Sequence, residues 1–340
     1  MTEKIRVGLM GFGQIGRQLY HLAAASQDLE IVAVSDIGAP EVLHYLLSTD
    51  SGRSAHCELD GNYLKNRQFR TRMMRADRPG EVPWDIFAVD VVIDATNRFR
   101  KAADMQAHLD SGAPRVIISQ LPQEHIDRLV LMGLNESELH REDRMISAGS
   151  ATTLALALAL TAVDEACGVE SASMTTVHAY TSDQSLQDYA GTDFRRSRSA
   201  AENIIPNTND SAHWVERVLP RFAGKLTGFA LNVPVQKGSL LDLDVVVSDP
   251  ATTIDDINAA MSAALERWPG LLQVTGDPIV SSDVIGNACS LLFDHRGTIK
   301  AGRRIFKLLG WYESLGHAAR ILDVVRAYAA LDRAAQEGQS

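Results

Sequence analysis

Residues 147–153 combine small and hydroxyl-bearing side chains in a pattern that could bind an anion. They read Ser-Ala-Gly-Ser-Ala-Thr-Thr and precede the apolar run Leu154–Val163, so we expect a helix to begin here. Backbone amides at a helix start are unpaired and lie at the positive end of the helix dipole. This start could therefore hold a phosphate, helped by the hydroxyls of Ser150, Thr152 and Thr153. A cysteine placed here would be a strong nucleophile with a lowered pKa, but residue 151 is alanine.

A second motif, near the N-terminus, combines a strand, a glycine-rich turn and a helix. The apolar run Ile5–Met10 leads into six residues with G-x-G-x-x-G spacing, namely Gly11, Phe12, Gly13, Gln14, Ile15 and Gly16. The glycines permit a tight turn, close approach of a pyrophosphate and packing of helix on strand. Asp36 follows twenty residues after Gly16, where a carboxylate accepts hydrogen bonds from ribose hydroxyls. The motif predicts binding of NAD, because this carboxylate would repel the extra phosphate of NADP.

Later strands of the first half end in polar residues. Val89–Ile93 has the pattern of a buried strand that leads to Thr96, and Arg115–Ser119 has the pattern of another. Such strand ends line the ligand crevice of a parallel sheet, although ordinary turn chemistry explains each residue equally well. Residues 43–81 contain short alternating segments and many charges, with a hairpin turn expected at Asp60-Gly61.

The pattern changes near residue 150, where we expect a domain boundary. Longer strand-like runs follow, at 171–181, 227–235 and 239–248, with helical patterns at 253–267 and 315–336. The sequence therefore predicts an α/β protein with two domains. Residues 1–150 would form a Rossmann domain with a doubly wound parallel sheet, and residues 151–314 an α+β domain with a mixed or antiparallel sheet.

Composition and charge argue against several classes of function. With 33 Lys and Arg against 43 Asp and Glu, the 340-residue chain has a formal charge of −10, which disfavours general nucleic-acid binding. No apolar run is long enough to span a membrane, and the first residues lack a signal-peptide pattern. Cys57, Cys167 and Cys289 show neither metal-ligand nor redox-pair spacing, and Cys289 lies in a strand-like segment as a small core residue. We expect no metal and a cytoplasmic location.

Nearly the whole chain resembles the phosphorylating glyceraldehyde-3-phosphate and erythrose-4-phosphate dehydrogenases. The resemblance rests on a series of motifs in order, namely Gly11–Arg17, Ser147–Thr153, Thr175–Thr181, Asp193–Pro206, Gly224–Gly228, Val280–Asp283 and Trp311-Tyr312. The segment from His178 to Ala201 is similar to the long S-shaped loop of that family.

The resemblance implies an NAD-dependent homotetramer whose C-terminal helix, here 315–340, packs back on the nucleotide domain. Residues 11–16, Asp36, Thr96 and Ser119 match cofactor-contacting or adjacent positions. His178 matches the histidine that activates the catalytic thiol. Positions that contact phosphate, or lie beside it, match Ser150, Thr152, Thr181 and Arg198. The implied ligand is a small molecule such as a sugar phosphate.

Several positions depart from the pattern of the family. Ala151 replaces the cysteine that attacks the aldehyde, and Asn232 replaces a phosphate-binding arginine. Asp210 adds a negative charge to the phosphate loop. The segment after Tyr312 is one residue short and lacks the asparagine that holds the nicotinamide amide. Cys167 cannot substitute for the missing thiol, because it stands roughly 24 Å along the expected helix from residue 151.

These features leave three hypotheses open. In the first, a non-classical homologue, or pseudoenzyme, keeps the fold, the oligomer and the NAD site, and acts as a ligand-responsive protein or as the partner of an active paralogue. In the second, an NAD-dependent oxidoreductase works without a covalent thioester, with His178 as general base. A histidine merely hydrogen-bonded within its strand fits that position equally well. In the third, the ordinary dehydrogenase activity persists at a residual level. Ser150 could replace the nucleophile only if His178 reached it.

Overall fold

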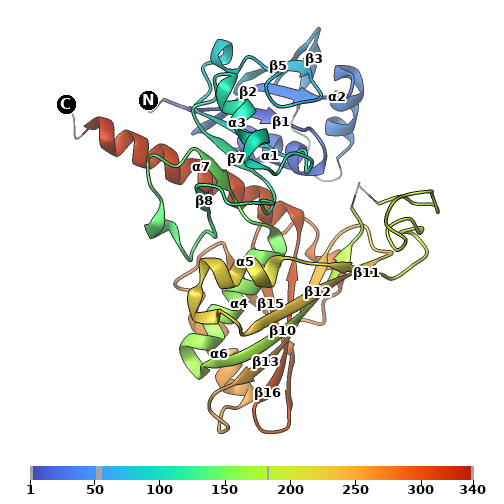
Figure 1. Ribbon diagram of the computed structural model, residues 1–340, viewed down its shortest axis with the longest axis vertical. Helices are drawn as coiled ribbons and strands as arrows, with labels where there is room; N and C mark the ends of the chain where they lie inside the picture. Colours follow the sequence, from blue (N-terminus) through green and yellow to red (C-terminus); the bar gives the residue numbers. More distant parts are fainter. Residues whose placement is uncertain (1–2, 51–55, 182–183, 338–340) are drawn as a thin grey trace. The chain divides into compact units, whose positions relative to one another are not determined.

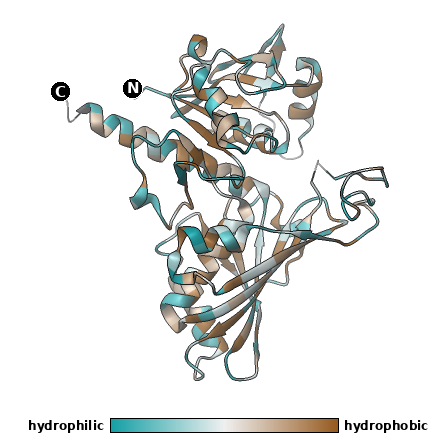
Figure 2. Ribbon diagram, viewed as in Figure 1, coloured by the Kyte–Doolittle hydropathy of each residue, from teal (hydrophilic) through white to brown (hydrophobic). Residues whose placement is uncertain are grey.

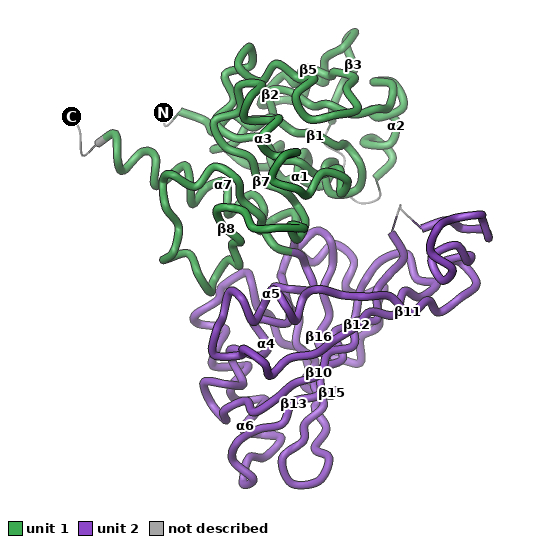
Figure 3. Tube along the Cα trace, in the orientation of Figure 1, with its two compact units in different colours: residues 1–149, 318–340 green, residues 150–317 purple. Residues whose placement is uncertain are grey.

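The computed structural model describes residues 3–50, 56–181 and 184–337 (Figure 1). The chain forms two compact units, one of residues 1–149 with 318–340 and one of residues 150–317 (Figure 3). Parts of three predicted segments lie outside the described residues: 51–55 of the alternating segments, 182–183 of the S-shaped loop and 338–340 of the C-terminal helix. Among the described residues, none of the helices combines the length and apolarity needed to cross a membrane.

Unit 1 is built on a mainly parallel sheet. Its strands are β1 (Ile5–Met10), β2 (Leu29–Asp36), β3 (Glu58–Asp60), β4 (Tyr63–Lys65), β5 (Arg70–Arg75), β6 (Val91–Asp94), β7 (Val116–Ile118), β8 (Arg128–Leu129) and β9 (Met145–Ser147). Helices α1 (Gln14–Ala24), α2 (Pro40–Thr49) and α3 (Ala102–Asp110) connect them. The strand order is β3-β4-β5-β2-β1-β6-β7-β9-β8. Strand β1 pairs with β2 on one side and with β6 on the other, so the strand order reverses at β1. This arrangement opens a ligand crevice at the carboxyl ends of a doubly wound sheet.

Apolar side chains bury both faces of this sheet. Along β6, Val91 and Ile93 join one hydrophobic cluster and Val92 joins another, as the alternation of side chains along a strand requires. The central strands are accordingly mostly hydrophobic (Figure 2). The predicted Rossmann-type sheet is confirmed.

The C-terminal helix α7 (Ser314–Glu337) enters the core of unit 1 from Ala318 onward. Ile321 and Val325 belong to the same cluster as the strand residues. Arg326 Nε lies 2.8 Å from Asp28 Oδ2, and the Tyr328 hydroxyl donates to Asp143 Oδ2 at 2.8 Å. Apolar packing and charged hydrogen bonds together hold this helix on unit 1.

Unit 2 is built on a mixed sheet. Its strands are β10 (Val169–Ala179), β11 (Ile205–Thr208), β12 (Leu226–Val233), β13 (Ser239–Val247), β14 (Leu272–Thr275), β15 (Leu291–Ala301) and β16 (Ile305–Tyr312), in the order β11-β12-β10-β13-β16-β15-β14. The β10–β12 and β14–β15 pairs are parallel, and the other described pairs are antiparallel. Helices α4 (Ala151–Cys167), α5 (Ser211–Val218) and α6 (Ile254–Ala263) complete it. The predicted mixed sheet is confirmed.

Some of the turns and helices predicted from local sequence are present, and others differ. The helix expected after residue 150 begins at Ala151, and the expected hairpin joins β3 to β4 through Gly61, whose φ is +57°. The short alternating segments expected over 43–81 include β3, β4 and β5, but the sequence did not predict α2, which extends to Thr49 and buries Leu43 and Leu47, one turn apart. Cys289 is buried as expected, but it precedes β15 in a turn where its backbone amide donates to Asn287 Oδ1.

Candidate functional site

The glycine turn between β1 and α1 leaves room where a phosphate would approach. Gly11 has a φ of +90°, and a Cβ on it would lie 2.8 Å from the backbone nitrogen of Thr96. A Cβ on Gly16 would lie 2.1 Å from the Gly11 carbonyl oxygen, so the start of α1 packs directly on the turn. A Cβ on Gly13 would meet no atom within 4 Å. Gly11 and Gly16 therefore match the tight turn and the close helix–strand packing that the motif predicts, and the open space beside Gly13 is compatible with the approach of a phosphate.

Asp36 stands at the end of β2 and is fixed beside this turn. Its Oδ2 accepts from the backbone amide of Phe12 at 2.7 Å, and its Oδ1 accepts from that of Gly38 at 2.8 Å. The Phe12 side chain is buried and stacks edge-on against Tyr20, so it belongs to the core. Gln14 and Ile15 are the first residues of α1, whose first turn contains no acidic residue. An open glycine, a helix start and an oriented carboxylate fit the pyrophosphate and ribose of a dinucleotide.

A buried hydrogen-bond network holds Thr96 against the glycine turn. Asp94 Oδ1 accepts from both the backbone amide and the hydroxyl of Thr96, at 2.8 and 2.6 Å. Asp94 Oδ2 lies 3.3 Å from His108 Nε2, and His108 Nδ1 accepts from Trp84 Nε1 at 3.1 Å. Ser119 is buried at the end of β7, and its amide donates to the Asp94 carbonyl. Asp94, His108 and Trp84 could not be predicted from the sequence as neighbours of this turn, because only the folded chain brings them together.

The hydroxyls at the start of α4 form hydrogen bonds with other residues of unit 2. Ser150 caps the helix, and its Oγ accepts from the Thr153 amide at 3.1 Å and lies 2.7 Å from the Thr153 hydroxyl. The Thr153 hydroxyl donates to Ser211 Oγ, and the Thr152 hydroxyl lies 2.7 Å from the Tyr312 hydroxyl. Thr152 and Thr153 are buried, whereas Ser150 and Ala151 are partly exposed. The three hydroxyls therefore do not gather into one phosphate cradle.

Tyr312 connects the helix start with His178. Its buried hydroxyl bonds both Thr152 and Thr176, and its ring meets the His178 imidazole edge-on with centroids 6.3 Å apart. Burial raises the pKa of the Tyr312 hydroxyl, so it stays protonated. His178 Nδ1 lies 2.6 Å from the Ala179 carbonyl oxygen, which can only accept. Nδ1 therefore carries a hydrogen, and in the neutral imidazole Nε2 is an acceptor.

The predicted phosphate residues beyond α4 lie in different surroundings. Asn232 is opposite His178 in the parallel β10–β12 pair, and its side chain is 7% exposed. The backbone amide of Thr181 donates to Gln184 Oε1 at 3.2 Å. Arg198 has a 59% exposed side chain and pairs with Asp188 at 3.0 Å. The structure thus brings Asn232 to His178, while the Arg198 guanidinium is engaged by a carboxylate on its own loop.

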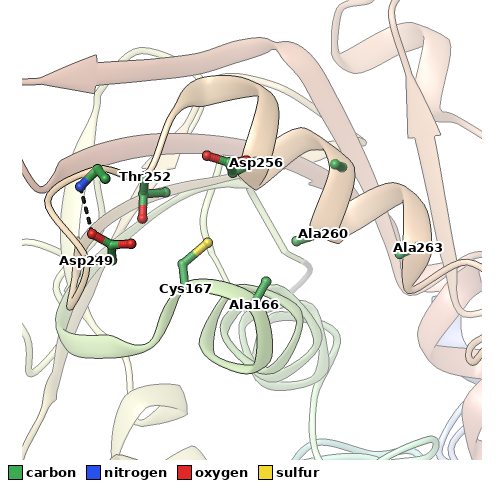
Figure 4. A pocket seen from close by; sticks show the side chains of 9 residues that line it. Ala166, Cys167, Asp249, Thr252, Asp256, Ala260 and Ala263 are labelled. Carbon is green, nitrogen blue, oxygen red and sulfur yellow. Dashed lines mark hydrogen bonds between the residues drawn. The ribbon is translucent and has the colours of Figure 1, made fainter.

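Cys167 lies at the far end of α4, in a pocket of about 580 Å³ between α4 and α6. Figure 4 shows its sulfur facing Thr252 and Asp256, with Asp249 nearby. Burial raises the pKa of the Cys167 thiol, and both aspartates oppose its ionisation. This thiol is a poor nucleophile and stands apart from Ala151. Across the described ranges, no three His, Cys, Asp or Glu side chains are grouped closely enough to hold a metal ion.

Comparison with known proteins decides the family. Residues 5–102 match the family model described as glyceraldehyde 3-phosphate dehydrogenase, NAD binding domain, and residues 150–314 match its C-terminal domain. The chain belongs to the glyceraldehyde-3-phosphate dehydrogenase family. It therefore carries that family's NAD-binding domain, and the predicted cofactor is confirmed.

Three relatives match nearly the whole chain. Glyceraldehyde-3-phosphate dehydrogenase 1 of Streptomyces avermitilis is 39% identical over 327 residues, which cover 94% of this chain and 97% of the relative. The glyceraldehyde-3-phosphate dehydrogenase of Mycobacterium tuberculosis strain H37Rv is 39% identical over 333 residues, with the same coverage. That of Kitasatospora aureofaciens is 38% identical over 334 residues, which cover 96% of this chain and 99% of the relative.

Proposed function

We propose that this chain is a non-classical glyceraldehyde-3-phosphate dehydrogenase homologue that binds NAD and a small ligand but does not catalyse the cysteine-dependent phosphorylating oxidation. The observation that carries the proposal is Ala151 at the first position of α4, in a helix start whose Ser150 cap and Thr152–Tyr312 hydrogen bond are intact. The thioester route needs a thiolate here, and alanine has no nucleophilic atom.

The surrounding residues support the loss of this reaction. In a comparable hydrolase, removal of the nucleophile lowers the rate by a factor on the order of 10⁶. Ser150 Oγ is committed to Thr153, and no hydrogen bond joins it to His178 in the described part of the chain. The Cys167 thiol has a raised pKa and lies at the other end of α4. We infer that no neighbouring group replaces the missing thiol.

We assign one ligand to each of the two units. We propose that residues 1–150 hold NAD through 11–16, Asp36, Thr96 and Ser119, with the C-terminal helix 315–340 completing that domain. Residues 151–314 would hold a small polar ligand, such as a sugar or sugar phosphate, beside His178. A cytoplasmic homotetramer that responds to NAD or to this ligand, or that partners an active paralogue, is the corresponding proposal for the assembled protein.

A calorimetric titration with NAD and NADH tests the proposal. Gly13→Ala adds a methyl group that meets no protein atom within 4 Å, so it should leave the fold intact and obstruct only the approaching phosphate. We expect wild type to bind NAD and Gly13→Ala to bind it about tenfold or more weakly. Gly276→Ala is the matched control, because its Cβ also meets no atom within 4 Å. Absence of NAD and NADH binding to wild type would refute the proposal.

One observation favours a second function, an oxidoreductase without a covalent intermediate. The His178 Nδ1 hydrogen bond to the Ala179 carbonyl leaves Nε2 as an acceptor, as a general base requires. NAD, when bound, supplies the hydride acceptor. His178 would take the proton of an alcohol or hydrated aldehyde. The test is NADH formation over a panel of aldehydes and hydroxy acids, with His178→Ala beside wild type. Activity that survives this substitution would exclude His178 as the base.

A further inference from the structure

Three side-chain amides form a connected cluster beside His178, which we call the amide cluster: Gln184, Asn207 and Asn232. Asn207 Nδ2 donates to Asn232 Oδ1 at 3.4 Å, and Asn232 Nδ2 donates to Gln184 Oε1 at 2.9 Å. Because Asn232 is opposite His178 in a parallel strand pair, the two side chains lie on the same face of the sheet. The cluster therefore borders the only imidazole that the proposed function uses.

Backbone amides fix the direction of these hydrogen bonds. Gln184 Oε1 also accepts from the Thr181 backbone amide at 3.2 Å, and Asn207 Oδ1 accepts from the Thr208 amide at 3.0 Å. Since a backbone amide can only donate, these oxygens cannot be exchanged with the side-chain nitrogens. The donors run from Asn207 through Asn232 toward Gln184.

With the hydrogen bonds in this direction, one side-chain donor of the cluster has no acceptor among the described residues. Gln184 is 8% exposed, and its Nε2 is buried without a hydrogen-bond acceptor among the described residues. Buried polar groups in native proteins nearly always have a partner, which can be a bound molecule. The geometry thus asks for an oxygen acceptor from outside the chain.

The charges around the cluster favour an uncharged acceptor. The cluster itself is neutral, and none of its described hydrogen bonds involves a lysine or arginine. Arg198, which was predicted to lie at or beside a phosphate site, pairs with Asp188 at 3.0 Å. A buried anion needs a paired cation, whereas a carbonyl or hydroxyl oxygen needs only a donor.

We propose that the amide cluster is a subsite for an uncharged carbonyl or hydroxyl oxygen, so that the ligand is an unphosphorylated sugar, aldehyde or alcohol at this end. The inference rests on the proposed function, which places a small ligand beside His178. Gln184 Nε2 donates to that oxygen, and Asn232 orients Gln184 while withholding the positive charge that a phosphate would need. Asn232 is then the residue that sets ligand specificity.

Ligand-observed NMR on the full chain, saturated with NAD, tests this subsite with D-glyceraldehyde and D-glyceraldehyde 3-phosphate. We expect wild type to bind glyceraldehyde at least as tightly as its phosphate. Gln184→Met should weaken glyceraldehyde binding about three- to tenfold, the value of one neutral hydrogen bond. Gln187→Met, at an exposed position of the same loop, should leave it unchanged.

A charge-restoring variant completes the test. Asn232→Arg should shift the preference toward the phosphorylated ligand by about tenfold or more. Equal binding by Gln184→Met and Gln187→Met, or a tenfold preference of wild type for the phosphate, overturns the subsite. The comparison of Gln184→Met with Gln187→Met still tests the subsite if circular dichroism shows that Asn232→Arg is unfolded. NAD titration of the same samples separates the two proposals, since failure to bind NAD refutes the proposed function and not only the subsite.

Discussion

Removal of the Tyr312 hydroxyl by Tyr312→Phe should destabilise unit 2. The hydroxyl bonds Thr152 and Thr176, and all three side chains are buried. A buried hydrogen bond contributes about 1 kcal/mol, so loss of two should lower the free energy of unfolding by about 2 kcal/mol. For a unit of this size, that corresponds to a fall in Tm of about 4–8 °C.

Urea unfolding followed by tryptophan fluorescence measures this effect in unit 2, which contains Trp214, Trp268 and Trp311. Tyr189→Phe is the matched control, because the Tyr189 side chain is 49% exposed in the same unit. It should change stability by less than about 0.5 kcal/mol. If Tyr312→Phe and Tyr189→Phe unfold at the same urea concentration, the hydroxyl network does not contribute as described.

The same variant carries a pH signature. The pKa of Tyr312 is raised above its ordinary value of 10.0, so its contribution is complete below pH 10 and is lost as pH rises beyond it. Wild type should therefore lose stability above pH 10 more steeply than Tyr312→Phe. Parallel curves for the two proteins would contradict the burial of an un-ionised hydroxyl.

Three further predictions concern other parts of the chain. Gly16→Ala places a Cβ 2.1 Å from the Gly11 carbonyl oxygen and should lower the free energy of unfolding of unit 1 by about 1–3 kcal/mol, measured by thermal denaturation. Hydrogen bonding to Arg326 lowers the pKa of Asp28 from 3.8 to about 2, so Arg326→Gln should destabilise above pH 4 by about 1 kcal/mol or less and converge with wild type near pH 2, seen in acid unfolding curves. Ala151→Cys places a thiol at the start of α4, which should react with iodoacetamide about tenfold faster than the native thiols in peptide mapping by mass spectrometry.

The elements and motifs that depend on neighbouring residues were predictable. The glycine turn follows from spacing within six residues, and the start of α4 follows from a capping serine before an apolar run. The strands of both sheets showed the expected apolar patterns, from which the fold class followed. Helix α2 was not predicted, because only Leu43 and Leu47 are buried on its apolar face, and two residues are too few to show a clear helical period.

The contacts that define the candidate site depend on long-range register. Tyr312 meets Thr152 across 160 positions of sequence, and Asn232 meets Gln184 across 48. Neither pairing follows from residue type, because each depends on how distant strands align. Strand β10 must align with β12, for example, to place Asn232 opposite His178. The sequence shows that Asn232 departs from the family pattern. Only the fold shows that its side chain bonds the amides of Asn207 and Gln184, the contacts on which the proposed subsite rests.

The most direct test of the central claim is the rate of NADH formation by wild type with NAD, D-glyceraldehyde 3-phosphate and inorganic phosphate. Without a thiol at residue 151, we expect a rate indistinguishable from that of a sample lacking protein, even though NAD binding is measurable in the same preparation. Phosphate-dependent NADH formation through many turnovers by the purified wild-type chain would contradict it.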